Sequence, residues 1–170
     1  IAGAEGIGKS TLFSVMGGEW FSDSLMTMEG KAGMEQARSG WVIELPELGG
    51  IKRSDVEQVK AYISRQNDMY RPAYGEVVEA HPRQCVFCGT TNERYFLKGD
   101  TGNRRFWVMS VDADLRKYPD PREALIRDRN QIWAEAVQRY KEHEPLYLSP
   151  ELEKEARERQ ATFNDDADDP

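Results

Sequence analysis

Residues 3–11, G-A-E-G-I-G-K-S-T, match the pattern G-x-x-x-x-G-K-[ST] completely, and this pattern is typical of a phosphate-binding loop. Glycines at this spacing let backbone N–H groups surround the β- and γ-phosphates, because a Cβ would block that approach. Lys9 adds a positive charge to the same oxygens, and the Ser10 hydroxyl is suited to ligate Mg²⁺. The loop therefore predicts a nucleoside triphosphate and Mg²⁺ as ligands. The residues expected to contact them are Gly3, Gly6, Gly8, Lys9, Ser10 and Thr11.

The position of the loop in the chain is also informative. A phosphate-binding loop normally follows a buried strand, yet only Ile1 and Ala2 precede Gly3. We therefore expect a truncated first strand and a chain that is part of a longer protein. The sequence has no basic n-region and no apolar run approaching about 18 residues, which predicts neither a signal peptide nor a membrane span. We expect a cytoplasmic protein.

The composition, 39% hydrophobic and 31% charged over 170 residues, is ordinary for a soluble globular domain. We expect one ATPase-type core over residues 1–148, followed by a charged helix and an acidic, disordered tail over residues 149–170. The net charge of −7 is concentrated in this tail, since residues 151–170 contain eight acidic and three basic residues. The charge balance argues only weakly against nucleic-acid binding, because a local basic strip remains possible in the body.

Apolar runs alternate with helical patterns along the chain, which predicts an α/β fold with a parallel sheet flanked by helices. Strands are expected at residues 24–28, 41–45, 84–90 and 105–111. Helices are expected from residue 11 and at residues 31–37, 54–65, 121–142 and 151–160. Prolines and Gly75 within residues 67–83 indicate two short extended arms joined by a turn. In such a fold the ligand lies at the carboxyl ends of the strands.

Cys85 and Cys88 form a single C-x-x-C pair, which is compatible with a redox pair or half of a zinc site. Both lie in the apolar run C-V-F-C, the chain has no second C-x-x-C, and His81 is the only histidine nearby. These observations favour a structural role inside a buried strand.

Polar residues stand at two of the expected strand ends. Glu44 and Glu47 follow the apolar run W-V-I, and an acid at such a place is costly without a partner. We assign Glu44 to Mg²⁺ and Glu47 to the attacking water. Asn92 closes the run Q-C-V-F-C-G-T-T-N and is suited to bind the γ-phosphate or the lytic water. The sequence thus predicts a catalytic set of Lys9 with these three residues.

Arg104 and Arg105 lead into the last expected strand. Alone, they would be ordinary salt-bridge partners. In a phosphate-binding enzyme they become candidates for a transition-state clamp supplied by a neighbouring subunit, which can raise the rate by roughly 10³–10⁵.

Five segments together resemble the virulence-associated E family: the phosphate loop, W-V-I-E-L-P-E-L, K-A-Y-I-S-R with Y-R-P-A-Y-G, H-P-R-Q-C-V-F-C-G-T-T-N and G-N-R-R-F-W. The resemblance covers roughly residues 3 to 112 and implies a P-loop ATPase of the AAA+ type with a superfamily-three-like helicase core. The family is similar to phage and genomic-island replication proteins. It implies ATP and Mg²⁺ bound between subunits of a homo-oligomeric ring that translocates on DNA, often fused to a primase-like domain.

The resemblance also implies roles for single residues. Lys9 and Ser10 would form the first nucleotide motif, and Asn92 would be the sensor. Glu44 and Glu47 would form the second motif, and Arg104 or Arg105 the arginine finger. One departure is that many such motors have adjacent acids in the second motif, whereas these two stand three apart around Pro46.

The resemblance further implies a hairpin over residues 65–83 that projects into the channel of the ring. Its cations would contact DNA phosphates and its rings would stack on bases. The residues expected to do so are Arg65, Arg71, Tyr74, His81 and Arg83. An ordinary surface hairpin is the alternative, and Glu76 and Glu79 in the same segment favour it.

The function that we predict is the ATP-hydrolysing motor core of a replication-type DNA helicase. A regulatory or phage-defence NTPase that scaffolds partners without unwinding DNA would keep every nucleotide residue, so it stays open. A small-molecule phosphotransferase would need an arginine-rich lid, and residues 99–105 are short for one.

Overall fold

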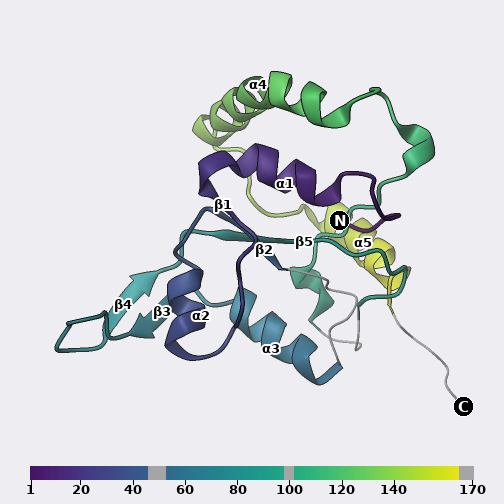
Figure 1. Ribbon diagram of the computed structural model, residues 1–170. Coiled ribbons are helices and arrows are strands. Elements are labelled where there is room, and N and C mark those ends of the chain that lie inside the picture. Colours follow the sequence, from purple (N-terminus) through teal and green to yellow (C-terminus); the bar gives the residue numbers. More distant parts are fainter. Residues whose placement is uncertain (46–52, 98–101, 165–170) are drawn as a thin grey trace, which may run out of the picture.

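The computed structural model describes residues 1–45, 53–97 and 102–164. A three-stranded parallel sheet lies at its centre, in the order β1-β2-β5, as Figure 1 shows. Its strands are β1 (Phe21–Ser22), β2 (Val42–Leu45) and β5 (Val86–Gly89). β2 pairs with β5 over its whole length, from Val42 opposite Val86 to Leu45 opposite Gly89. The predicted α/β architecture with a parallel sheet is confirmed.

The chain start extends this sheet beyond β5. Ala2 forms parallel bridges with Thr91 on one side and Ser110 on the other. Its N–H donates to the Met109 carbonyl over 2.9 Å, and its carbonyl accepts from the Val111 N–H over 2.9 Å. The glycine-rich loop of residues 3–8 therefore begins where this extended segment ends.

Helices cover both faces of the sheet (Figure 1). α1 (Lys9–Gly17) and α4 (Pro121–Lys141) lie on one face, and α2 (Gly30–Gln36) and α3 (Arg53–Ile63) lie on the other. α4 is fastened to the end of α1, because Arg129 and Trp133 both donate to the Met16 carbonyl, over 3.2 and 3.0 Å. No helix in the described ranges is both long and apolar enough to cross a membrane.

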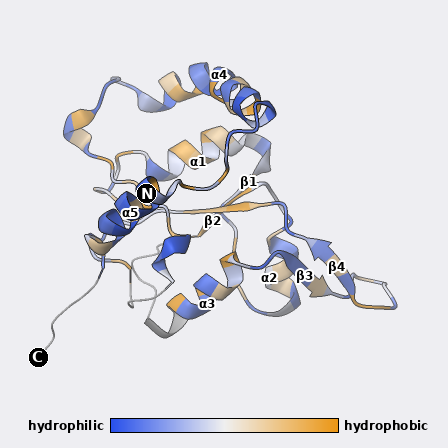
Figure 2. Ribbon diagram, turned by 180° about the vertical axis from the view of Figure 1, so that it is seen from behind, coloured by the Kyte–Doolittle hydropathy of each residue, from blue (hydrophilic) through white to orange (hydrophobic). Residues whose placement is uncertain are grey.

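The main core forms between β2 and the α2–α3 face. β2 appears as a hydrophobic strand in Figure 2, and Ile43 at its centre is fully buried. Buried residues of this core are Leu25, Ala37, Ile43, Leu45, Val59 and Tyr62. The Tyr62 hydroxyl donates to the Gly33 carbonyl over 2.6 Å, so its polar atom is satisfied within the apolar cluster.

The C-terminal helix α5 (Pro150–Ala161) packs against the body of the protein. Gln160, at its end, is buried and donates to the Phe106 carbonyl over 2.8 Å. The Phe163 carbonyl accepts from the N–H groups of Phe96 and Leu97, and its ring packs 5.8 Å from that of Phe96. The stretch just after α5 therefore contributes to a second small core.

A two-stranded antiparallel sheet projects from the side of the molecule (Figure 1). It consists of β3 (Asn67–Tyr70) and β4 (Glu79–Pro82), with Asn67 opposite Pro82. This confirms the two predicted arms joined by a turn. Three short 3₁₀ helices complete the described structure: η1 (Gly18–Trp20), η3 (Asn103–Arg105) and η4 (Ala113–Leu115).

Two of the predicted strands are wrong. Residues 24–28 are irregular, because the Gln36 side chain binds the N–H groups of Met26 and Thr27 in place of a strand partner. Among the described residues, 105–111 make a single bridge, at Ser110. A ladder needs a partner residue for each residue, and in the described ranges the short chain start is the partner that they have.

Candidate functional site

The loop over residues 3–8 has a backbone that side chains would not tolerate well. Gly6 and Gly8 have φ angles of +76° and +92°, in the left-handed region that favours glycine. A Cβ added at Gly6 would meet no atom within 4 Å, so the loop is open to solvent at this point. α1 begins directly after Gly8, so its N-terminus faces the same side as the loop. The arrangement suits an anion, because backbone N–H groups and the helix dipole both favour negative charge there.

The Lys9 side chain folds back over this loop. Its ammonium donates to the carbonyls of Gly3 and Ala4, over 2.9 and 2.7 Å, and to the amide oxygen of Asn92 over 2.6 Å. Residues 83 positions apart in the sequence thus meet at the mouth of the loop. The contact joins the loop to the end of β5, as expected from the order of the two motifs.

The end of β2 supplies the third member of the site. Glu44 is buried, with only 6% of the residue exposed. Its Oε1 accepts from the Ser10 hydroxyl over 2.7 Å and from the Thr90 hydroxyl over 3.1 Å. Thr90 was not among the predicted site residues, although its place just after β5 carried the same signal as Asn92. Both hydroxyls are neutral, so a buried carboxylate here favours a nearby cation.

The donor set fits Mg²⁺. This cation is usually held by one or two carboxylates together with hydroxyl groups, water and substrate phosphates. Glu44 and Ser10 provide that minimal set beside the loop. No group of three or more His, Cys, Asp or Glu side chains suited to a metal occurs in the described part of the chain, so an all-protein metal cage is not found there.

Glu47, the expected partner of the lytic water, lies outside the described residues. Arg104 and Arg105 lie in η3, and the structure does not bring them to the loop of the same chain. Arg105 donates to the Ser64 hydroxyl over 2.6 Å, just after α3, and to the Gly102 carbonyl over 3.2 Å. α3 covers the face of the sheet opposite α1 (Figure 1). Both arginines are exposed to solvent on that side.

The two cysteines are half-buried free thiols on or next to β5. Burial raises the pKa of the Cys85 thiol. Burial, together with the nearby Glu44 carboxylate, raises the pKa of Cys88 to about 12. A protonated thiol is a poor nucleophile and a poor metal ligand, which agrees with the structural role predicted for both.

The five residues expected to contact DNA fall into two groups. Arg65, Arg71 and Tyr74 are exposed, and Tyr74 lies in the turn of the hairpin with a positive φ of +65°. His81 is held by Arg38, with 2.9 Å between Nη1 and Nδ1, and its ring stacks on Tyr70 at 4.2 Å. Because these contacts hold His81 within the hairpin, it is less available to contact DNA than Arg65, Arg71 and Tyr74.

Arg83 is fixed inside the fold. Its guanidinium binds Asp68 through two contacts of 2.6 and 3.0 Å, and the two side chains are 5% and 1% exposed. The same group lies over the rings of Tyr62 and Phe87, at 4.6 and 5.3 Å. A guanidinium that is buried and paired within the chain does not reach a DNA phosphate, so we withdraw Arg83 from the expected DNA contacts.

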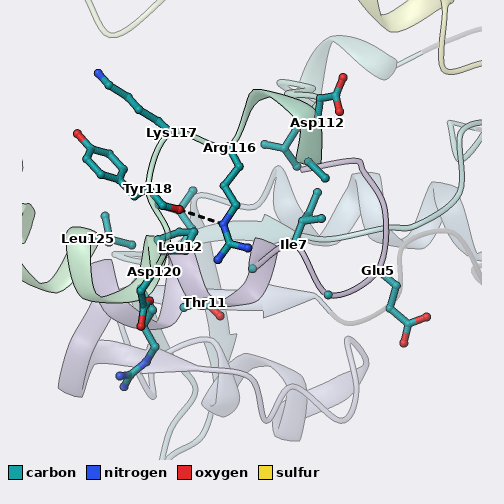
Figure 3. A pocket seen from close by; sticks show the side chains of 16 residues that line it. Glu5, Ile7, Thr11, Leu12, Asp112, Arg116, Lys117, Tyr118, Asp120 and Leu125 are labelled. Atoms are coloured by element: carbon teal, nitrogen blue, oxygen red, sulfur yellow. Dashed lines mark hydrogen bonds between the residues drawn. The ribbon is translucent and has the colours of Figure 1, made fainter.

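A cavity of about 480 Å³ opens beside the loop (Figure 3). The loop and the start of α1 form one wall, and residues 111–125 form the other. No sequence pattern predicted this cavity, because its second wall combines an irregular stretch with the start of α4.

A family model described as the virulence-associated protein E-like domain matches residues 1–165. Comparison with curated proteins gives no match. The match spans nearly the whole chain, including the loop, both polar strand ends and α5, so the protein belongs to the virulence-associated protein E-like family.

Proposed function

We propose that this chain is the ATP-hydrolysing motor core of a replication-type DNA helicase, from a phage- or plasmid-associated replication protein. One observation supports the nucleotide part most strongly. Lys9 contacts Asn92 and Ser10 contacts Glu44, so the loop meets two neighbouring parallel strands at their carboxyl ends. This is where ligands bind in open α/β sheets.

Each residue has a task in the proposed site. Lys9 would turn its ammonium from the Gly3 and Ala4 carbonyls to the phosphate oxygens, a small movement from its present position. Ser10 and Glu44 would hold Mg²⁺, which neutralises charge on the β- and γ-phosphates when bound. Thr90 orients the Glu44 carboxylate through its hydroxyl.

Asn92 would hold the γ-phosphate or the attacking water. Its amide oxygen already accepts from Lys9, so its amide N–H₂ points elsewhere and keeps two donors for such a ligand. Glu47 stays our candidate for orienting the water. It stands three residues after Glu44 in the sequence, which is the basis for this assignment.

The arginine finger would act between subunits of a homo-oligomeric ring. Arg104 and Arg105 lie on the α3 side of the sheet, away from the loop of their own chain. A guanidinium on that face can serve a nucleotide only if the nucleotide belongs to a neighbour. The projecting hairpin, with Arg65, Arg71 and Tyr74 exposed, would contact the DNA strand.

The test is ATP turnover with and without single-stranded DNA, on the wild type and on Lys9→Ala. The motor predicts turnover that DNA stimulates strongly and that Lys9→Ala abolishes while the circular dichroism spectrum is unchanged. Turnover without stimulation would favour a scaffold NTPase, and phosphate transfer to a small acceptor would favour a phosphotransferase. Wild-type turnover in a folded Lys9→Ala variant would refute the nucleotide site itself.

Glu47→Gln separates the chemistry from binding. If Glu47 orients the lytic water, the amide should retain ATP and Mg²⁺ affinity and slow the hydrolysis by orders of magnitude. The matched control is Glu19→Gln, an exposed acid in η1. Equal rates for Glu47→Gln and the wild type would remove Glu47 from the mechanism.

A further inference from the structure

The cavity beside the loop has a defined chemical character. Ile7 and Leu12 contribute apolar surface from the loop and α1, and Leu125 contributes it from the first turns of α4. Figure 3 shows these side chains around the opening between the two walls. A volume of about 480 Å³ lies within the usual range of small-molecule pockets, which is roughly 300–1,000 Å³.

Three of the residues that line this cavity are basic: Arg116, Lys117 and Arg122. The Arg116 guanidinium points from its turn toward Ile7 and Leu12 (Figure 3). Its Nε donates to the Tyr118 carbonyl over 3.0 Å, and a second nitrogen donates to the Pro119 carbonyl. Two carbonyls of the following turn thus hold the planar group in place. A fixed guanidinium plane is a surface on which a nucleobase stacks.

The cavity and the phosphate loop share residues. Gly6, Gly8 and Thr11 belong to the phosphate-binding motif and also line the cavity. A triphosphate held by the loop carries its nucleoside at one end, and that end must leave the loop on a side with free space. One side of the loop is occupied by the side chains of Lys9, Asn92 and Glu44. The cavity provides free space at Gly6 and Thr11.

We propose that this cavity binds the base and ribose of the nucleotide, with the base between the Arg116 guanidinium and the apolar side chain of Leu125. This inference rests on the proposed triphosphate site and adds its selectivity. The chain would bind nucleoside triphosphates better than inorganic polyphosphates, and residues 111–125 would determine the difference.

Affinity measurements with two probes, ATP and inorganic tripolyphosphate, both with Mg²⁺, test the proposal by titration calorimetry. Leu125→Trp should fill the cavity and weaken ATP binding by about tenfold or more, since one misfit in an apolar pocket changes selectivity by roughly 10–200-fold. Tripolyphosphate affinity should stay within about twofold, because it needs only the loop. Ile126→Trp is the matched control, since Ile126 is exposed and does not line the cavity.

The outcomes separate the two proposals. Unchanged ATP affinity in Leu125→Trp, or equal losses for both probes, overturns the base site and leaves the triphosphate site standing. Wild-type protein that binds neither probe overturns both. Lys9→Ala should lose both probes together, which confirms that the loop, and not the cavity, holds the phosphates.

A second variant tests the base site without filling the cavity, so that a disturbed fold cannot explain the result. Leu125→Cys places a reactive thiol in the cavity, while the pKa of each native cysteine is raised by burial and keeps their background labelling slow. ATP at saturation should slow maleimide labelling of Leu125→Cys several-fold, and tripolyphosphate should not. Labelling at the same rate with and without saturating ATP overturns the base site.

Discussion

Asp68→Ala is expected to destabilise the protein by about 3–5 kcal/mol, because it leaves the Arg83 guanidinium buried without a counter-ion. The side chains of Asp68 and Arg83 are 1% and 5% exposed, so bulk water has little access to the guanidinium. The Tyr62 carbonyl and the two rings beside the guanidinium would remain, but they do not neutralise its charge. The loss is a large share of a typical domain's stability, which is about 5–15 kcal/mol.

The assay is urea unfolding followed by circular dichroism, with the free energy of unfolding compared between variants. Glu135→Ala is the matched control, because Glu135 pairs with Arg139 over 2.8 Å with both side chains more than half exposed. Such a pair contributes about 0–1 kcal/mol. The double variant Asp68→Leu with Arg83→Met should recover most of the loss, since it removes both charges and keeps apolar volume in their place.

A loss below about 1 kcal/mol for Asp68→Ala, similar to that of Glu135→Ala, would refute the reasoning. Arg83 would then be free to leave its pocket, and it would return to the residues expected to contact DNA. A matching functional readout is single-stranded DNA affinity, which the double variant should retain within a few-fold, whereas Tyr74→Ala should lower it.

Three further predictions concern the site. Glu44→Gln keeps an oxygen that accepts from Ser10 and Thr90, but it should abolish most of the gain in ATP affinity that Mg²⁺ provides. The measurement compares ATP affinity with Mg²⁺ and with EDTA. An unchanged gain would contradict the assignment of Glu44 to the metal. In an oligomeric form, alanine at Arg104 or Arg105, whichever is the finger, should spare ATP binding and remove most turnover. Mixing that variant with Lys9→Ala should restore part of the activity, and a co-assembled but inactive mixture would argue against action between subunits. The pKa of Cys88 is about 12 in the folded protein against an ordinary 9.0, so the unfolded chain loses this proton at lower pH. The contribution of Cys88 to the free energy of unfolding should therefore be fully present below pH 9 and be lost toward pH 12. Urea titrations should show a shallower fall of stability with pH in Cys88→Ala, and identical slopes would contradict the prediction.

The sequence alone was sufficient for features that depend on local pattern. The glycine spacing of residues 3–11 predicted a loop that only glycines allow, and Gly6 and Gly8 have the positive φ angles that this requires. The almost continuous apolar run W-V-I-E-L predicted a buried strand, and β2 is buried from Ile43 to Leu45. The order of loop, acidic strand end and polar strand end also predicted that both strand ends would lie at the loop. In the structure Asn92 contacts Lys9, and Glu44 contacts Ser10.

Other features depended on partners far away in the chain, so pattern alone could not determine them. Residues 105–111 have the composition of a strand, but the part of the chain that the structure describes offers them too few extended neighbours for a ladder. Arg83 looked like a hairpin cation until Asp68 was found beside it in a buried pair. Strand composition and side-chain charge are local properties, whereas pairing and burial are decided by what the rest of the chain places alongside.

The cavity beside the loop shows most clearly the difference between features that a local sequence pattern predicts and features that depend on tertiary packing. The sequence by itself was enough to predict a phosphate-binding loop at the chain start, because the glycine spacing is a local pattern. Only the tertiary structure decided that Arg116 and Leu125 lie next to that loop, more than a hundred residues further on. Packing of α4 against α1 brings them there, because the contacts of Arg129 and Trp133 fix α4 on α1. No residue spacing within the loop or within α4 encodes this proximity.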